Sequence, residues 1–248
     1  MEVHHHPDLH HKKIHFKEYF LEFLMIFLAV FMGFIAENIR ERISDKEKEK
    51  EYIHSFIQNL QDDTSRLNTI IAENKKKIIG LDSLVSLSFK NIDLPENRRS
   101  LYRLTGQFAT YYSLFTGSDA TMQQLKNSGG LRLIRKNHVA DSIAKYDIEM
   151  DEVKEGEKYY NKAMDDCFQS IIQVLDFSVY YDTTYFKNGS YTNKMPPLLI
   201  YEKQKIKFFF NEVINEKFTT RNYIYHLKAR LSFALRMIAF LKKEYNFE

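Results

Sequence analysis

The chain has 248 residues, of which 44% are hydrophobic, and its formal net charge is +3 with acidic and basic residues interspersed. A charge this small gives no support to nucleic-acid binding. The single cysteine, Cys167, excludes an internal disulfide and any metal site built from several cysteines. Only eight glycines and four prolines interrupt long segments rich in Lys, Glu, Leu, Ile and Gln. We therefore predict an all-α protein with one soluble domain.

Residues 1–16 are predicted to form a flexible, His-rich tail. Pro7 and the lack of a periodic pattern give this stretch no fixed geometry. Clustered imidazoles can bind zinc, copper or nickel, so metal binding stays an alternative to a solvated tail. We assign no metal ligand and no cofactor. The histidines concerned are His4, His5, His6, His10, His11 and His15.

Residues 17–41 are predicted to form a transmembrane anchor helix. From Tyr19 to Ala36 only Glu22 interrupts the apolar run, and a bilayer core of about 30 Å takes about 20 apolar helical residues. A soluble core helix would keep a polar face, which this run lacks. A cleaved signal peptide is the nearest alternative, but no clear small-x-small cleavage site follows the run. We expect the lipid bilayer to be the partner of this uncleaved anchor.

The anchor also bears on self-association, ion coupling and topology. Ala29 and Gly33 lie one helical turn apart and offer a small-residue surface for a second anchor, which predicts a homo-oligomer. Glu22 lies near the edge of the span, and we interpret it as an interfacial carboxylate. An intramembrane proton or cation site is the alternative. Lys and Arg counts and net charge favour opposite orientations, so the side on which the C-terminal domain lies stays open.

A heptad pattern follows the anchor and predicts that its helix continues to about Phe89. Such a 3.5-residue repeat favours coiled-coil-like packing along a neighbouring helix. Asn74 interrupts the seam. It either fixes the register or oligomeric state of a coiled coil, or forms an intramolecular hydrogen bond inside the bundle. The seam consists of Ile53, Ile57, Leu60, Thr64, Leu67, Ile71, Asn74, Ile78, Leu81 and Val85.

Two shorter helices are predicted next. Pro95 ends the first long helix, and a second helix is expected over residues 96–115. Thr116–Gly117 breaks it, and a third helix restarts at a capping Ser118 or Asp119. This third helix is expected to stop at Gly129–Gly130.

A second heptad predicts another long helix, capped by Asn137 and ending near Leu175. Two heptad helices separated by shorter ones are typical of an antiparallel helical bundle, which we assign to residues 42–248. Cys167 lies in this seam, and we interpret it as a buried, inert thiol. The seam consists of Val139, Ile143, Tyr146, Met150, Val153, Glu157, Tyr160, Met164, Cys167 and Ile171.

Residues 176–197, the aromatic segment, differ in character from the helices around them. They are rich in Tyr and Phe and contain the turn signal Asn188–Gly189. A hairpin arm over residues 179–186 and a long loop packed by its aromatic rings are both consistent with this composition. Long loops in compact domains are often functional, so we expect any binding surface of the domain here.

The C-terminal part is predicted to return to helix. One segment is expected over residues 198–217 and another over residues 221–245, with a break at residues 218–220. The last segment is a basic amphipathic helix, and we expect its apolar stripe to pack in the bundle. Binding to an anionic lipid surface is the alternative.

No catalytic constellation is recognisable. The sequence lacks a Gly-rich phosphate loop, His-Glu-x-x-His, Cys-x-x-Cys and a nucleophile elbow. Asp62–Asp63 and Asp165–Asp166 are adjacent, so neither pair places both carboxylates on one helix face. We predict that the protein is not an enzyme, and no catalytic, cofactor-binding or metal residue is nominated.

The stretches KEYFLEFLMIFLAVFMGFIAENIRE (residues 17–41) and LKNSGGLRLIRKN (residues 125–137) carry a family resemblance. The chain resembles uncharacterised single-pass membrane proteins of Bacteroidota that carry a His-rich N-terminal tail. The similarity covers most of the chain, and it implies a bacterial inner-membrane location but no activity. The sequence is thus interpreted as a membrane-anchored scaffold or protein-interaction module with an unknown protein partner. A ligand-sensing domain and an ion-coupled membrane component are the alternatives.

Overall fold

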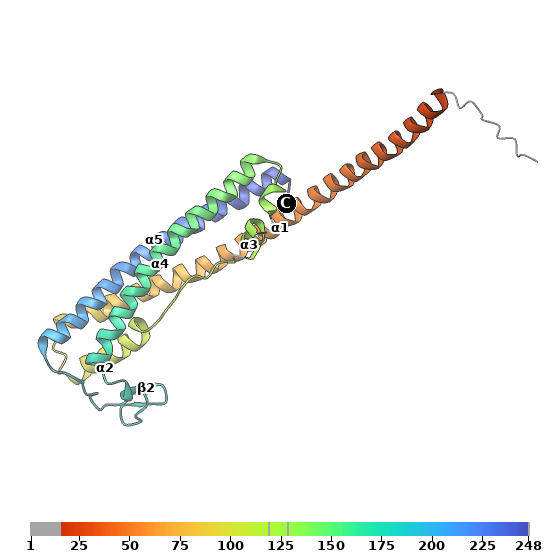
Figure 1. Cartoon of the computed structure of the whole chain (residues 1–248). Coiled ribbons are helices and arrows are strands. Elements are labelled where there is room, and N and C mark those ends of the chain that lie inside the picture. Colours follow the sequence, from red (N-terminus) through yellow and green to blue (C-terminus); the bar gives the residue numbers. More distant parts are fainter. Residues whose placement is uncertain (1–15, 119, 128, 248) are drawn as a thin grey trace, which may run out of the picture. The chain divides into compact units, whose positions relative to one another are not determined.

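The computed structural model describes residues 16–118, 120–127 and 129–247. These form two compact units, one ending at Glu51 and one beginning at Tyr52. Helix α1 (Phe16–Ser86) contributes to both, and the 3-10 helix Leu87–Phe89 follows it (Figure 1). The predicted continuous helix is therefore confirmed. All but the last residue of the predicted His-rich tail lies outside the described residues.

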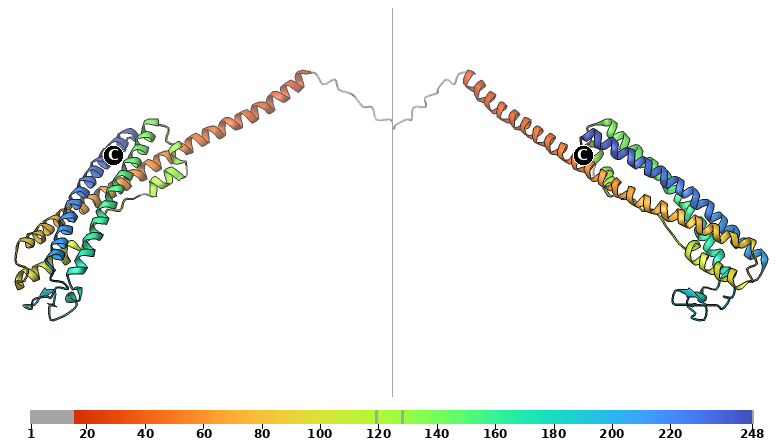
Figure 2. Two further views of the ribbon diagram at one scale, coloured as in Figure 1. Left: turned by 60° about the vertical axis from the view of Figure 1, so that its left-hand side comes forward. Right: turned by 180° about the vertical axis from the view of Figure 1, so that it is seen from behind.

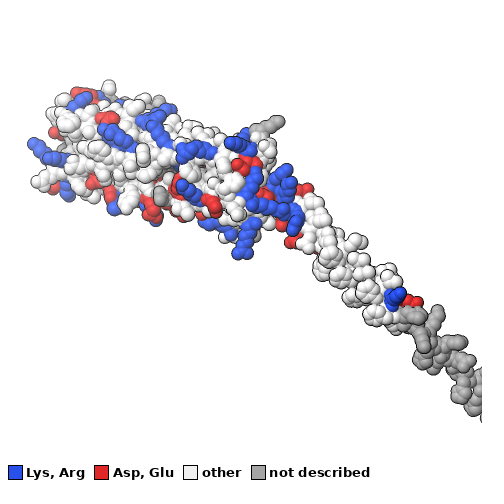
Figure 3. All heavy atoms as spheres, turned by 90° about the horizontal axis from the view of Figure 1, so that it is seen from above, with Lys and Arg blue, Asp and Glu red and all other residues white. Residues whose placement is uncertain are grey.

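The first unit presents its apolar side chains on the outside of α1. An 18-residue window of this helix has a mean hydropathy of 2.3, and none of it is buried. Figure 3 shows a stretch of this helix with hardly any coloured side chain. Among the described residues, this one helix is long and apolar enough to span a membrane. The predicted span, residues 17–41, lies within it.

The second unit is a helical bundle. Helix α1 from Tyr52 onward, α4 (Asn137–Val174) and α5 (Lys203–Tyr245) run side by side in Figures 1 and 2. Helix α5 is antiparallel to the other two, which confirms the all-α antiparallel bundle. Shorter elements connect these helices: α2 (Pro95–Leu104), a π-helical turn (Thr105–Ala109), α3 (Ala120–Asn127), 3-10 helices at Gly130–Arg132 and Phe177–Tyr180, β1 (Phe186–Lys187) and β2 (Ser190–Tyr191).

Both heptad seams lie in the core of the bundle. In α4 every seam position is buried except Glu157, which is half-buried. In α1 the seam is buried at most positions, while Thr64, Ile78 and Val85 are partly exposed. Burial of this apolar area at roughly 25 cal/mol per Å² is the main force that holds the helices together. The buried α1 seam residues are Ile53, Ile57, Leu60, Leu67, Ile71, Asn74 and Leu81.

The predicted second helix is shorter than expected, because regular structure ends at Ala109 rather than near Phe115. Residues 111–118 run without regular structure. Side chains of the long helices bind the backbone there: Lys77 Nζ donates to Tyr111 O at 2.8 Å, and Asn74 Nδ2 donates to Ser113 O at 2.9 Å. These bonds supply partners that a helix would have supplied internally. Asp119, one of the two predicted caps, lies outside the described residues.

The predicted break at residues 218–220 is wrong, since α5 is continuous. Thr219 Oγ1 donates to Glu216 O at 2.9 Å, and Thr220 Oγ1 donates to the same carbonyl at 2.7 Å. Such bonds to the preceding turn satisfy the hydroxyls inside a helix. Helix α5 also begins later than predicted, at Lys203 rather than residue 198.

Other predicted boundaries shift by a few residues. Asn137 is the first residue of α4, and Lys136 occupies the capping position without a side-chain bond. Gly129 has a left-handed backbone (φ 70°) after α3, as a glycine stop requires. The hairpin is not at residues 179–186, where a 3-10 helix precedes it. It is centred on Asn188–Gly189.

Candidate functional site

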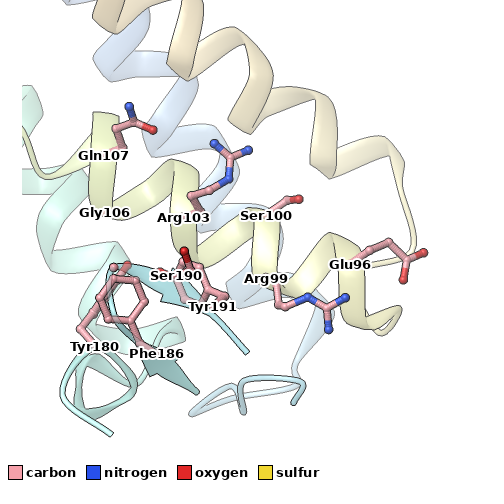
Figure 4. Close-up of a pocket in the computed structure, with 11 residues that line it drawn as sticks. Glu96, Arg99, Ser100, Arg103, Gly106, Gln107, Tyr180, Phe186, Ser190 and Tyr191 are labelled. Atoms are coloured by element: carbon pink, nitrogen blue, oxygen red, sulfur yellow. The ribbon is translucent and has the colours of Figure 1, made fainter. Parts of the chain in front are cut away.

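A groove of about 690 Å³ lies between α2 and the aromatic segment (Figure 4). One wall is the face of α2 and the π-helical turn that follows it. Residues one helical turn apart share a face, so α2 presents Glu96, Arg99, Ser100 and Arg103 together, with Gln107 beyond them. We refer to this space as the α2 groove.

The opposite wall of the α2 groove is the β1–β2 hairpin with Tyr180. Asn188 and Gly189 both have positive φ, 52° and 77°, which is the backbone of a tight two-residue hairpin turn. The turn pairs Phe186 with Tyr191, whose rings meet edge to face at 5.1 Å. Thr192 N also donates to Tyr185 O at 2.8 Å. The turn at Asn188–Gly189 thus positions the two strands that form this wall.

Two tyrosines fix the aromatic segment to α2. Tyr102 is fully buried, and its hydroxyl donates to Pro197 O at 2.7 Å while accepting from Asp176 N at 2.8 Å. It therefore holds both ends of the segment. Tyr180 Oη donates to Tyr102 O at 2.8 Å. A Cβ atom at Gly106 would lie 2.8 Å from Tyr180 Oη, so the close approach of the two walls requires glycine there.

Two neighbouring arginines complete this attachment. Arg98 is a buried residue of α2, and its Nη1 donates to Pro196 O at 3.4 Å, while Nη2 contacts Asp93 Oδ1 at 2.6 Å and Nε donates to Ile92 O at 2.8 Å. Arg99 Nη1 donates to Asn193 O at 3.0 Å. Because guanidinium groups bind carbonyls through fixed N–H directions, these contacts hold the loop in one arrangement.

The charged side chains of the α2 groove are spread along it. Figure 4 shows the guanidinium of Arg103 extending away from the hairpin, whereas that of Arg99 extends toward the Glu96 end. The two cations therefore do not converge on one point, as a site for a single small anion would require. The arrangement instead suits an extended partner with acidic groups placed along its length.

A second polar site lies in the centre of the bundle, and sequence reasoning missed it. Lys77 and Glu216 are 1% and 0% exposed, and Lys77 Nζ lies 2.7 Å from Glu216 Oε1. Lys77 Nζ also lies 3.3 Å from Tyr160 Oη and 3.3 Å from Met164 Sδ. Lys77 precedes Leu81 by one turn and follows Asn74 by three residues, which was the available signal for its burial.

Burial determines the protonation chemistry of this pair. It lowers the pKa of Lys77 and raises the pKa of Glu216, because a charge loses its hydration in the core. Burial and the nearby Glu216 carboxylate also raise the pKa of the Cys167 thiol, which is fully buried. The predicted burial of this cysteine is therefore confirmed. Both charged groups are closed off from solvent, and their ion pair links α1 to α5 inside the core.

A looser buried pair links α1 to α5. Arg230 Nη2 lies 3.9 Å from Asp63 Oδ2, and both side chains are 5% exposed. Asp63 Oδ1 accepts from Ser118 N at 2.9 Å, and the guanidinium of Arg230 lies 4.3 Å from the Phe115 ring centre. Burial raises the pKa of Asp63. This pair attaches the irregular segment that precedes α3 to the two long helices.

The structure also shows the surroundings of Asn74, Gly33 and Glu22, which the sequence analysis considered. Tyr160 Oη donates to Asn74 Oδ1 at 3.1 Å, so Asn74 forms hydrogen bonds inside the bundle. A Cβ at Gly33 would meet nothing within 4 Å, and Glu22 is exposed. No three His, Cys, Asp or Glu side chains are grouped as a metal site in the described part of the chain. The His-rich stretch lies outside that part.

Comparisons with known proteins find no family model, curated protein or solved structure that matches this chain.

Proposed function

We propose that the protein is a single-pass membrane protein whose helical bundle is a protein-interaction module. The support for the membrane location is the apolar window of α1, none of which is buried by the rest of the chain. Exposed apolar surface of this extent is unfavourable in water and favourable in hydrocarbon. We place the protein in the bacterial inner membrane on the resemblance given above.

We propose that the α2 groove binds an extended acidic segment of a partner protein. The observation that carries this proposal is that the guanidinium groups of Arg99 and Arg103 point in different directions and do not meet at one point. An elongated site lined by separated cations and by tyrosines offers several weak contacts rather than one strong anion site. The partner makes its contacts with a wall that Tyr102 and Arg98 already hold in place, which limits the entropy lost on binding.

Site-specific photo-cross-linking of the full chain in cells tests this binding. A benzoylphenylalanine placed at Gln107 or Ser190, both exposed at the α2 groove, is expected to cross-link to an acidic peptide of one partner. Arg99→Glu with Arg103→Glu is expected to lower the yield at least tenfold. The matched control is Arg221→Glu with Lys228→Glu, two exposed cations of α5.

The control chain should retain the adduct. Adducts that survive charge reversal in the groove, or that form equally from a probe at the exposed Tyr225, would rule out the proposed site. Maleimide labelling of cysteines placed at Lys17 and Tyr225, before and after the membrane is made permeable, would establish the side on which the bundle lies.

A ligand-sensing role is the second candidate, and the volume of the α2 groove favours it. A space of about 690 Å³ falls within the range of small-molecule sites, about 300–1,000 Å³. A thermal-shift screen of the full chain with small di- and tricarboxylates distinguishes the two. A stabilisation that Arg99→Glu abolishes would support a ligand, and a negative screen together with a groove-dependent cross-link would support a protein partner.

A further inference from the structure

A second cavity lies at the end of the bundle where α1 finishes and α5 begins. It encloses about 650 Å³ and shares no lining residue with the α2 groove. Its floor is apolar: Phe210 is buried, and Ile206 packs against the same core cluster. Phe89, which is 88% exposed, forms part of its wall. We call this space the end cavity.

The charged groups around the end cavity are mostly cationic. Lys90, Lys203 and Lys207 line it, and within the described part of the chain no carboxylate lies at ion-pair distance from their ammonium groups. Asp93 is the acid in the lining, and it contacts the buried guanidinium of Arg98 at 2.6 Å. The lining therefore offers unneutralised positive charge beside an apolar floor.

We propose that the end cavity binds a single-chain amphiphile with an anionic headgroup. The alkyl chain lies on Ile206 and Phe210 beneath Phe89, and the headgroup meets the ammonium groups of Lys203 and Lys207. A fatty acid and an alkyl phosphate share this chemistry. The volume is suited to such a ligand, since small-molecule pockets measure about 300–1,000 Å³. The proposal does not depend on partner binding at the α2 groove.

The chain itself provides a sharp assay, because it contains no tryptophan. Phe89→Trp places one indole at the wall of the end cavity in the full-length protein. The protein is reconstituted in phosphatidylcholine nanodiscs with a tryptophan-free scaffold and titrated with 12-bromododecanoate, whose bromine quenches indole on contact. We expect saturable quenching. The matched reporter is Phe208→Trp. Phe208 is an exposed ring of α5 that does not line the cavity, so this indole should not be quenched.

Chain length and charge provide independent readouts. Shortening the probe to 8-bromooctanoate removes four methylenes and is expected to weaken binding by about two orders of magnitude. Lys203→Glu with Lys207→Glu in the Phe89→Trp chain should weaken it about tenfold. Lys205→Glu with Lys228→Glu, exposed cations outside the cavity, should not. Competition by laurate or by dodecyl phosphate identifies the preferred headgroup.

Several results would overturn the proposal. Equal quenching of both tryptophan reporters would show contact with probe dissolved in the bilayer. Equal binding of 12-bromododecanol would remove the role of the lysines. Absence of quenching in a Phe89→Trp chain whose far-ultraviolet circular dichroism matches that of the parent would exclude the amphiphile.

Discussion

Residues 20–36 and residues 53–85 belong to one helix, yet their apolar side chains have opposite surroundings. In the first stretch Leu21 and Phe31 are 57% and 51% exposed. In the second, Leu67 and Leu81 are fully buried. The difference is one of pattern, since the first stretch is apolar on every face and the second only along a 3.5-residue seam. A seam can be covered by two neighbouring helices, whereas a fully apolar cylinder needs a solvent that covers all of it.

The two stretches also differ in where they place polar side chains. In residues 20–36 the acid Glu22 lies close to one end of the run. In residues 53–85 the polar side chains of Asn74 and Lys77 are buried, because α4, α5 and the segment after α2 provide partners for them. The bundle can hold a charge inside because it supplies the opposite charge. Residues 20–36 contain no basic side chain that could pair with a buried carboxylate.

Placing charge in the proposed anchor, residues 17–41, should have the strongest consequence. Phe27→Arg with Phe31→Arg should cost about 5–7 kcal/mol of insertion free energy, at about 2.5–3.5 kcal/mol for each arginine in mid-span. We expect the double variant to be removed from membranes by alkaline carbonate, while the parent stays. Ser65→Arg with Asn68→Arg, at exposed positions of the bundle part of α1, is the control. If both double variants stay in the membrane fraction, residues 17–41 are not the anchor.

The buried pair provides the next largest effect. Lys77→Met leaves the Glu216 carboxylate buried without its cation, which should cost about 3–5 kcal/mol. Combining it with Glu216→Leu should restore stability or exceed it by about 1–4 kcal/mol. The midpoint of urea unfolding, followed by circular dichroism, measures both. Lys217→Met, which removes a partly exposed contact with Asp82, should cost less than about 1 kcal/mol. A double variant as unstable as the single one would contradict this account.

The seams were predictable from sequence because burial follows local spacing. Seven of the ten predicted seam positions in α1 and nine of the ten in α4 are buried, and predicting them requires only the period of the helix. Pairing is different. Lys77 meets Glu216, and Asn74 meets Tyr160, because the fold brings separate helices together, and no spacing along the chain encodes that meeting.

Local propensity misled where tertiary contacts override it. The run Phe218-Thr219-Thr220 reads as a break, yet Thr220 is buried within α5 and its hydroxyl is satisfied one turn back. The stretch after Ala109 reads as helix, yet Lys77 and Asn74 bind its carbonyls in an irregular conformation. The α2 groove was predicted only as a region, since the Asn188–Gly189 turn was readable but the facing arginines of α2 were not tied to it.

Alkaline titration distinguishes buried tyrosines from exposed tyrosines by the pH at which each group ionises. Burial raises the pKa of Tyr102, Tyr160 and Tyr223, each at most 1% exposed. Their folded-state pKa lies above the unfolded value near 10. The contribution of these buried tyrosines to the free energy of unfolding is therefore fully present below pH 10 and is lost as the pH rises further. Each contributes a slope of about 1.4 kcal/mol per pH unit above pH 10.

Absorbance at 295 nm measures this directly, because the chain has 16 tyrosines and no tryptophan. We expect exposed tyrosines such as Tyr181, 91% exposed, to ionise reversibly near pH 10. The buried group should ionise together with the loss of helical circular dichroism. A single smooth titration near pH 10 with the helix content unchanged would show that the tyrosines are accessible to water.

Two glycines of α1 give the smallest and most local comparison. A Cβ at Gly80 would lie 2.1 Å from Cγ of Phe108, whereas one at Gly33 would meet nothing within 4 Å. Gly80→Ala should therefore cost about 1–3 kcal/mol through overpacking, and Gly33→Ala should leave urea unfolding of the bundle unchanged.

Because self-association through Ala29 and Gly33 needs close approach, Gly33→Leu should lower the yield of anchor-to-anchor cross-links while leaving membrane insertion intact. Unchanged cross-linking would remove this face from the proposed oligomer, and a bundle destabilised by Gly33→Ala would mean that the anchor is packed by protein rather than lipid.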